Sequence, residues 1–238
     1  MDVPLPPGGF GEDFLAWLRE ASERGWQRIN DPDIRATRLF WPRWRRGTRW
    51  TGGLTVATIM EIEHRYDVHF PAQHRLFLQA LHSTTPWRYG PDYSRDRTRP
   101  VLRERPGFYN RLRDDEHIRT ATRHVIDGLL SETLDQQYWH HSWGPCPHPL
   151  EERRARMTEL VAAAPPLIPI FGHRFLIDHG PRPVLSIMGT DVVVYGDDLR
   201  DYLLHELRDV LDMVGVQYAA PVGDAPHIPF WNHIINLD

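Results

Sequence analysis

The residues with the most evident potential for chemistry in this 238-residue chain lie between Tyr138 and His148, in the sequence YWHHSWGPCPH. Imidazole nitrogens and a cysteine thiolate are good zinc ligands by type. Their spacing argues against a metal site, because His140 and His141 are adjacent and their side chains are expected to diverge. Cys146 has no matching partner pair elsewhere in the sequence. We therefore interpret the segment as a packed, tryptophan-rich loop, and we predict no metal and no cofactor.

Carboxylates and a histidine in the C-terminal third suggest a second chemistry, hydrolysis by paired acids. The candidates are Asp191 with Asp197 or Asp198, beside His173. The sequence TDVVVYGDDL also has a structural explanation, because Asp191 can close a hairpin turn and aspartates favour a helix N-terminus. The sequence contains no P-loop, no nucleophile elbow and no HExxH motif. We predict that the protein is not an enzyme, with a hydrolase or metal-dependent enzyme as the alternative.

Two arginine-rich stretches raise the question of a charged partner. Residues 35–50 hold six arginines and no acid, interleaved with aromatic residues. Charge and stacking rings together suit a single-stranded nucleic acid, but the whole chain carries a net charge of -4. We therefore favour an ordinary surface, or a patch for an acidic protein, and regard nucleic acid as an unlikely partner. Residues 88–113 hold eight arginines against three acids, which is typical of a solvated face.

The composition is that of a folded domain, because 41% of the residues are hydrophobic. All 28 basic residues are arginine, and Cys146 is the single cysteine, which indicates a reducing compartment. No apolar run approaches the length of a membrane span. The N-terminal sequence MDVPLPPGGFGEDF lacks the basic and apolar parts of a signal peptide. We expect a cytoplasmic protein without a membrane partner.

An antiparallel sheet is predicted to position the C-terminal candidates. The tight Gly189-Thr190 link between two runs of β-branched residues indicates a hairpin, and Pro169 suits an edge strand. After Gly196, Asp197 or Asp198 can cap a helix with apolar residues at three- and four-residue spacing. The expected strands cover residues 167–170, 174–177, 184–188 and 191–195.

Helices are predicted both upstream and downstream of this sheet. Thr55 caps a helix that ends before Pro71, and a second helix follows directly. An N-terminal helix starts near Phe10 and ends near Gly25, and Trp87 to Val101 is expected to be a long surface loop. Further helices are expected around residues 118–129 and over residues 150–163. The apolar C-terminal tail is expected to dock on the domain, or else to form a dimer contact through Phe230 and Trp231.

Three separated blocks carry a family resemblance. The sequences GLTVATIMEIEHRYDVHFPAQHRLFL, PPLIPIFGHRF and PVLSIMGTDVVVYGDDLRDYL together resemble the SUKH superfamily, which groups fungal cell-wall-assembly regulators, bacterial Syd proteins and many toxin-immunity proteins. The resemblance implies a single α+β domain with an antiparallel sheet packed against helices. It would cover residues 51–214, with an insertion at about 88–163, an extension at 1–50 and a tail at 215–238. The insertion resembles longer, actinobacterial-style members of the superfamily.

The resemblance also implies a non-catalytic protein-binding scaffold. The expected partner is a protein, for example a toxin that this chain neutralises; regulation of cell-wall or envelope processes is the other binding hypothesis. Residues 191–212 carry seven acids against two arginines, which would suit the basic cleft of a nuclease. The predicted partner-binding residues are Trp139, Trp143, His173, Arg174, Asp191, Asp198, Asp201 and Glu206.

Overall fold

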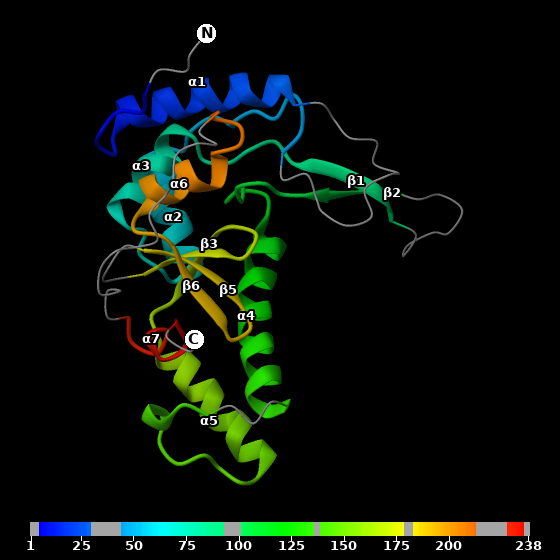
Figure 1. The fold of residues 1–238 in the computed structure, drawn as a ribbon, viewed down its shortest axis with the longest axis vertical. Helices are drawn as coiled ribbons and strands as arrows, with labels where there is room; N and C mark the ends of the chain where they lie inside the picture. The colour runs from blue at the N-terminus through cyan, green and yellow to red at the C-terminus, as the bar shows by residue number, and fades with distance from the viewer. Residues whose placement is uncertain are drawn as a thin grey trace.

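A four-stranded antiparallel sheet with helices on both faces forms the centre of the molecule (Figure 1). The computed structural model describes residues 5–29, 44–92, 101–135, 139–178, 183–212 and 228–235. Within these residues the architecture confirms the α+β prediction. The helices are α1 (Glu12–Arg28), α2 (Val56–Tyr66), α3 (Ala72–Ala80), α4 (Asp115–Asp135), α5 (Leu150–Ala163), α6 (Leu199–Leu207) and α7 (Asn232–Ile235), with a 3-10 turn over His141–Trp143.

The sheet follows the chain in the order β3-β4-β5-β6, with every neighbouring pair antiparallel. Its strands are β3 (Leu167–Phe171), β4 (Arg174–Ile177), β5 (Val184–Met188) and β6 (Asp191–Gly196). Pro169 lies on the edge strand β3, where its missing N–H costs no ladder bond. Gly189 turns the β5–β6 hairpin at φ +61, a conformation that favours glycine. These strands match the predicted ones closely.

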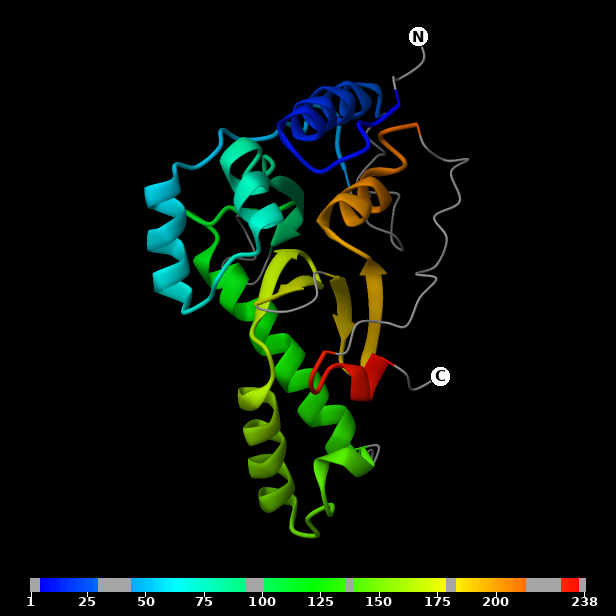
Figure 2. The same ribbon diagram turned by 90° about the vertical axis from the view of Figure 1, so that its left-hand side faces the viewer.

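The alternation of side chains gives the sheet two buried faces. On one face, Ile168, Leu176 and Val184 join a core formed with α1, α2, α3 and α6. On the other, Phe175, Leu185 and other residues join a second core formed with α4, α5 and the segment that contains α7. In Figure 2 the sheet lies between α1, α3 and α6 on one side and α4, α5 and α7 on the other. We call these the first face and the second face.

The first face is closed by a network of aromatic rings. Phe108, which is 1% exposed, lies with its ring centroid 5.0 Å from that of Trp50 and 5.3 Å from that of Phe171. Trp26 of α1 packs in the same network, with its ring tilted against those of Trp44 and Trp50. The prediction that α1 ends near Gly25 was wrong. The helix continues through Gly25 to Arg28, and glycine at this position serves close packing instead, because a Cβ there would meet the carbonyl oxygen of Val210 at 1.9 Å.

The second face is covered by residues of the predicted insertion and of the tail. Val125 and Leu129 of α4 and Met157 of α5 are buried against the sheet. Phe230 and Trp231 are buried with them, so this part of the tail packs in the second core. Residues 213–227 and 236–238 of the tail lie outside the described residues. The predicted insertion and tail therefore complete a core.

One predicted loop is a hairpin. Strands β1 (Trp87–Asp92) and β2 (Val101–Arg105) pair antiparallel, with an irregularity between Tyr89 and Pro91. Glycine, proline and arginine suggested a loop, but a two-stranded ribbon consists of edges and tolerates a proline. Residues 93–100 and 30–43, which include 35–43 of the first arginine-rich stretch, lie outside the described residues. No helix that the structure describes is long and apolar enough to cross a bilayer.

Candidate partner-binding surfaces and an arginine-lined pocket

Trp139 and Trp143, two of the predicted partner-binding residues, lie where the tail docks. Trp143 is 1% exposed, and its ring stacks on Phe230 at a centroid distance of 5.7 Å. Its Nε1–H donates to His233 Nδ1 at 3.2 Å. Trp139 is half-buried, and its Nε1–H donates to the Gly144 carbonyl oxygen at 2.9 Å. Trp143 therefore serves the second core and cannot contact a partner in this conformation, whereas Trp139 keeps an accessible face.

The expectation that the side chains of His140 and His141 diverge was wrong. Their ring centroids lie 4.2 Å apart, and His140 also stacks on His233 at 4.7 Å. Partial burial and the two neighbouring imidazoles lower the pKa of His140. Because an indole N–H can only donate, His233 Nδ1 must accept from Trp143, so this imidazole is neutral. Among the described residues, no group of three or more histidine, cysteine or acidic side chains could hold a metal ion.

Arg174 and Glu206 were predicted on a partner-binding surface, and their burial corrects that prediction. They are 5% and 3% exposed, and Arg174 Nε lies 3.6 Å from Glu206 Oε2. Arg174 Nη1 also donates to Ser186 Oγ at 2.7 Å, and its guanidinium lies 3.7 Å from the Tyr195 ring centroid. The inward position follows from the register, because Arg174 pairs with Ser186 on the face covered by α6. The pair joins the sheet to α6.

His173 and Asp191, the residues of the hydrolase alternative, lie at the same end of the sheet. Both are exposed; His173 lies in the turn that precedes β4 and Asp191 at the start of β6, with β5 between these strands. Two strand spacings correspond to roughly 10 Å. They do not share the pocket described below.

Two of the acidic side chains at the start of α6 accept hydrogen bonds from backbone N–H groups at the helix N-terminus. Asp198 caps α6, because its Oδ1 accepts from the Asp201 N–H at 2.9 Å and its Oδ2 from Gln73 Nε2 at 3.0 Å. Asp201 Oδ2 in turn accepts from the Asp197 N–H at 3.1 Å. Asp197 is exposed, and partial burial together with Asp201 and Asp198 raises the pKa of its carboxyl. Asp191 lies at the opposite end of β6, so the predicted acidic surface is divided.

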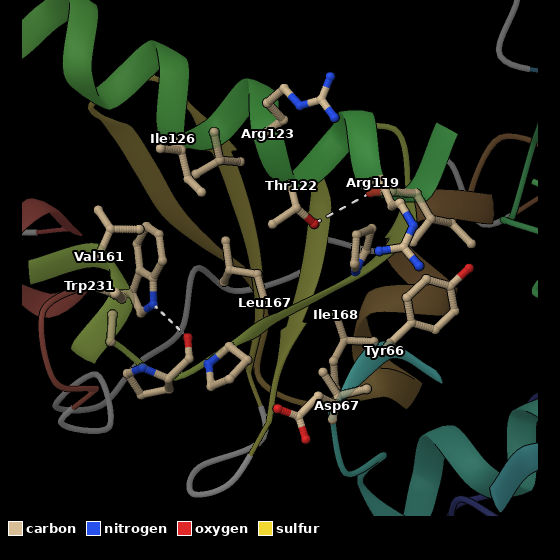
Figure 3. Close-up of a pocket in the computed structure, with 18 of the residues that line it drawn as sticks. Tyr66, Asp67, Arg119, Thr122, Arg123, Ile126, Val161, Leu167, Ile168 and Trp231 are labelled. Carbon is tan, nitrogen blue, oxygen red and sulfur yellow. Dashed lines mark hydrogen bonds between the residues drawn. The ribbon is translucent and has the colours of Figure 1, made fainter. Parts of the chain in front are cut away.

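A pocket that the sequence did not reveal opens between α4 and β3 (Figure 3). Its volume is about 610 Å³, within the range of about 300–1,000 Å³ typical of small-molecule sites. Figure 3 shows Ile126, Val161 and Trp231 at one end and Tyr66 and Arg119 at the other. The described lining residues come from the α2–α3 junction, α4, the end of α5, β3 and the docked tail.

Arg111 lines this pocket although it is 2% exposed. Its Nη2 donates to the carbonyl oxygen of Pro169 and lies 3.5 Å from His74 Nε2, and its guanidinium lies 5.3 Å from the Phe70 ring centroid. Arg111 belongs to the arginine-rich stretch that we interpreted as a solvated face, and for this residue that interpretation was wrong. No sequence signal distinguished it, because charge composition does not show which arginine points inward.

No protein-family model, curated protein or solved structure matches this chain.

Proposed function

We propose that this protein is a non-catalytic protein-binding module of the SUKH type, and that it binds a toxin or a regulatory protein partner. The observation that carries the proposal is that the three resembling blocks meet in a single core. They supply α2–α3, strand β3, and the β5–β6 hairpin with α6, and residues of all three pack on the first face. A module built in this way presents its outer surfaces to another molecule.

The acidic side of the molecule near α6 supports a basic partner surface. Asp197 is exposed at the start of α6, and Asp209 and Asp212 follow its end with 74% and 58% of their side chains exposed. Arg208 Nε lies 3.5 Å from Asp209 Oδ1, and Arg28 Nη2 lies 2.7 Å from Asp212 Oδ2. These arginines reduce the negative charge of the surface without removing it. Exposed charges of this kind steer association and fix specificity more than they add affinity.

The test compares the proteins that co-purify with the tagged wild type and with a tagged charge-reversed variant. The charge reversal must not disturb the fold. Asp198, Asp201 and Glu206 are unsuitable, because they cap α6 or lie in the core. The double variant Asp197→Lys/Asp209→Lys changes exposed positions. The matched control Glu151→Lys/Glu152→Lys makes the same charge change at the exposed start of α5.

The expected result is one protein that co-purifies in stoichiometric amount with the wild type and the control and is lost from the α6 variant. If the α6 variant retains that protein, the interface lies elsewhere on the molecule. If the tagged wild type co-purifies with no stoichiometric partner under native expression conditions, the binding-module proposal is contradicted.

A further inference from the structure

The pocket between α4 and β3 has two chemically different ends. Its apolar end is formed by aliphatic side chains, prolines and an indole whose N–H already donates to the Pro165 carbonyl oxygen at 3.4 Å. An apolar group placed there would contact carbon atoms and leave no pocket donor unsatisfied. The apolar wall includes Ile126, Val161, Pro165, Leu167 and Trp231.

The other end is cationic. Among the described lining residues, the cations are Arg111, Arg119 and Arg123, and the carboxylate is Asp67. Arg119 already has a carboxylate partner, because its Nε lies 3.0 Å from Asp115 Oδ2. Arg111 and Arg123 have no carboxylate within 4.0 Å among the residues that the structure describes. Two positive charges of the pocket therefore lack a carboxylate counter-ion within the described part of the chain.

Arg111 makes this end unusual, because a buried charge is costly unless it is paired. Its described neighbours are a carbonyl oxygen, a phenyl ring and His74, and burial lowers the pKa of that imidazole well below its usual value, so that it carries no charge. Burial also lowers the pKa of the Arg111 guanidinium to about 10. The guanidinium thus stays charged at neutral pH and has several N–H groups for which a planar anion is the natural acceptor.

We propose that this pocket binds an amphipathic carboxylate, with its carboxylate at the arginine end and an aliphatic or aromatic body between α4 and β3. The uncompensated, buried Arg111 and the exposed Arg123 would recognise the charge. The apolar wall that extends to Trp231 would bind the body. This inference concerns a small ligand and does not depend on the proposed protein-binding function.

The experiment is isothermal titration of the full chain with octanoate, and with 1-octanol and octylamine as probes of the same length. Octanoate is expected to bind at one site, 1-octanol about tenfold or more weakly because it lacks the charge-assisted hydrogen bonds, and octylamine not measurably. Equal binding of octanoate and 1-octanol would overturn the proposal, because the arginines would then contribute nothing. Failure of octanoate to bind at millimolar concentration would also overturn it.

Variants locate the site. Ala162→Trp fills the pocket from an exposed position, and Arg123→Glu reverses an exposed rim charge, so neither relies on a core substitution. Each is expected to weaken octanoate binding at least about tenfold, whereas Arg24→Gln on the exposed face of α1 leaves it unchanged. Arg111→Met, if it folds, should abolish the preference for octanoate over 1-octanol. Octanoate affinity that is unchanged in both Ala162→Trp and Arg123→Glu would refute the assignment of this pocket.

Discussion

The two faces of the central sheet are covered by different parts of the chain. The first face is closed by stacked aromatic rings, and it contains the buried Arg174–Glu206 pair. The second face has its own aromatic residues, Trp143, Phe175, Phe230 and Trp231, and it is completed by α4, α5 and a tail segment that returns from the far end of the chain. The comparison indicates that the stability of the first face depends on large side chains and on a charge pair. The stability of the second face depends on the docking of distant segments.

The largest effect is expected from the centre of the aromatic network. Phe108→Ala removes a ring that contacts Trp50, Phe77 and Phe171, and such truncations cost about 3–5 kcal/mol. Chemical denaturation monitored by circular dichroism measures the loss in free energy of unfolding. Leu130→Ala, at a partly buried position beside the second core, should cost clearly less, and an equal loss would remove the distinction between the faces.

The charge pair on the first face gives the next effect. Glu206→Leu leaves the Arg174 guanidinium uncompensated in the core, which is expected to cost about 3 kcal/mol. The double variant Arg174→Met/Glu206→Leu removes both charges and should recover most of the lost stability. The same denaturation experiment tests both variants. A double variant less stable than Glu206→Leu alone would show that Arg174 stabilises the fold through Tyr195 and Ser186 rather than through the carboxylate.

The first face should also confer acid sensitivity through two buried histidines. Burial, followed by the charge of Arg111, lowers the pKa of His74 well below its usual value and that of His82 to about 4. Between pH 6.5 and about 4 the unfolded chain therefore binds protons that the native state excludes, so stability falls as the pH decreases. Each histidine contributes up to about 1.4 kcal/mol per pH unit.

His74→Phe is the matching variant, because a phenyl ring preserves the contacts with Phe70 and Phe77. Its unfolding free energy should change less steeply over this pH range than that of the wild type. Identical slopes would mean that His74 does not contribute to the acid sensitivity.

The smallest effect is expected where the tail docks on the second face. His233→Leu removes the acceptor of the Trp143 indole hydrogen bond, a loss of about 1 kcal/mol. Hydrogen exchange in α7 should therefore be faster in His233→Leu than in the wild type at the same pH. His233→Asn keeps an acceptor, and its α7 exchange should lie closer to that of the wild type. Equal α7 exchange in His233→Leu and the wild type would show that this hydrogen bond does not hold the tail.

The sequence allowed the sheet and its flanking helices to be predicted, because β-branched runs, Gly189 and the Asp198 cap act locally. The cap was predicted at Asp197 or Asp198, and the structure places it at Asp198. The same local pattern did not reveal that Arg174 and Glu206 meet in the core. Their positions depend on strand register and on how α6 packs. The pocket escaped prediction for the same reason, since Arg111 faces inward only through tertiary contacts with Pro169 and His74.

The most direct test of this account is native-state hydrogen exchange of the full chain at neutral pH, comparing the amides of Leu203 in α6 and Val125 in α4. These buried residues lie on opposite faces of the sheet. If the predicted insertion completes the domain core, both amides should exchange through global unfolding with the same free energy. A much lower free energy at Val125 would show that α4 opens independently, and it would contradict the conclusion that the insertion completes the domain core.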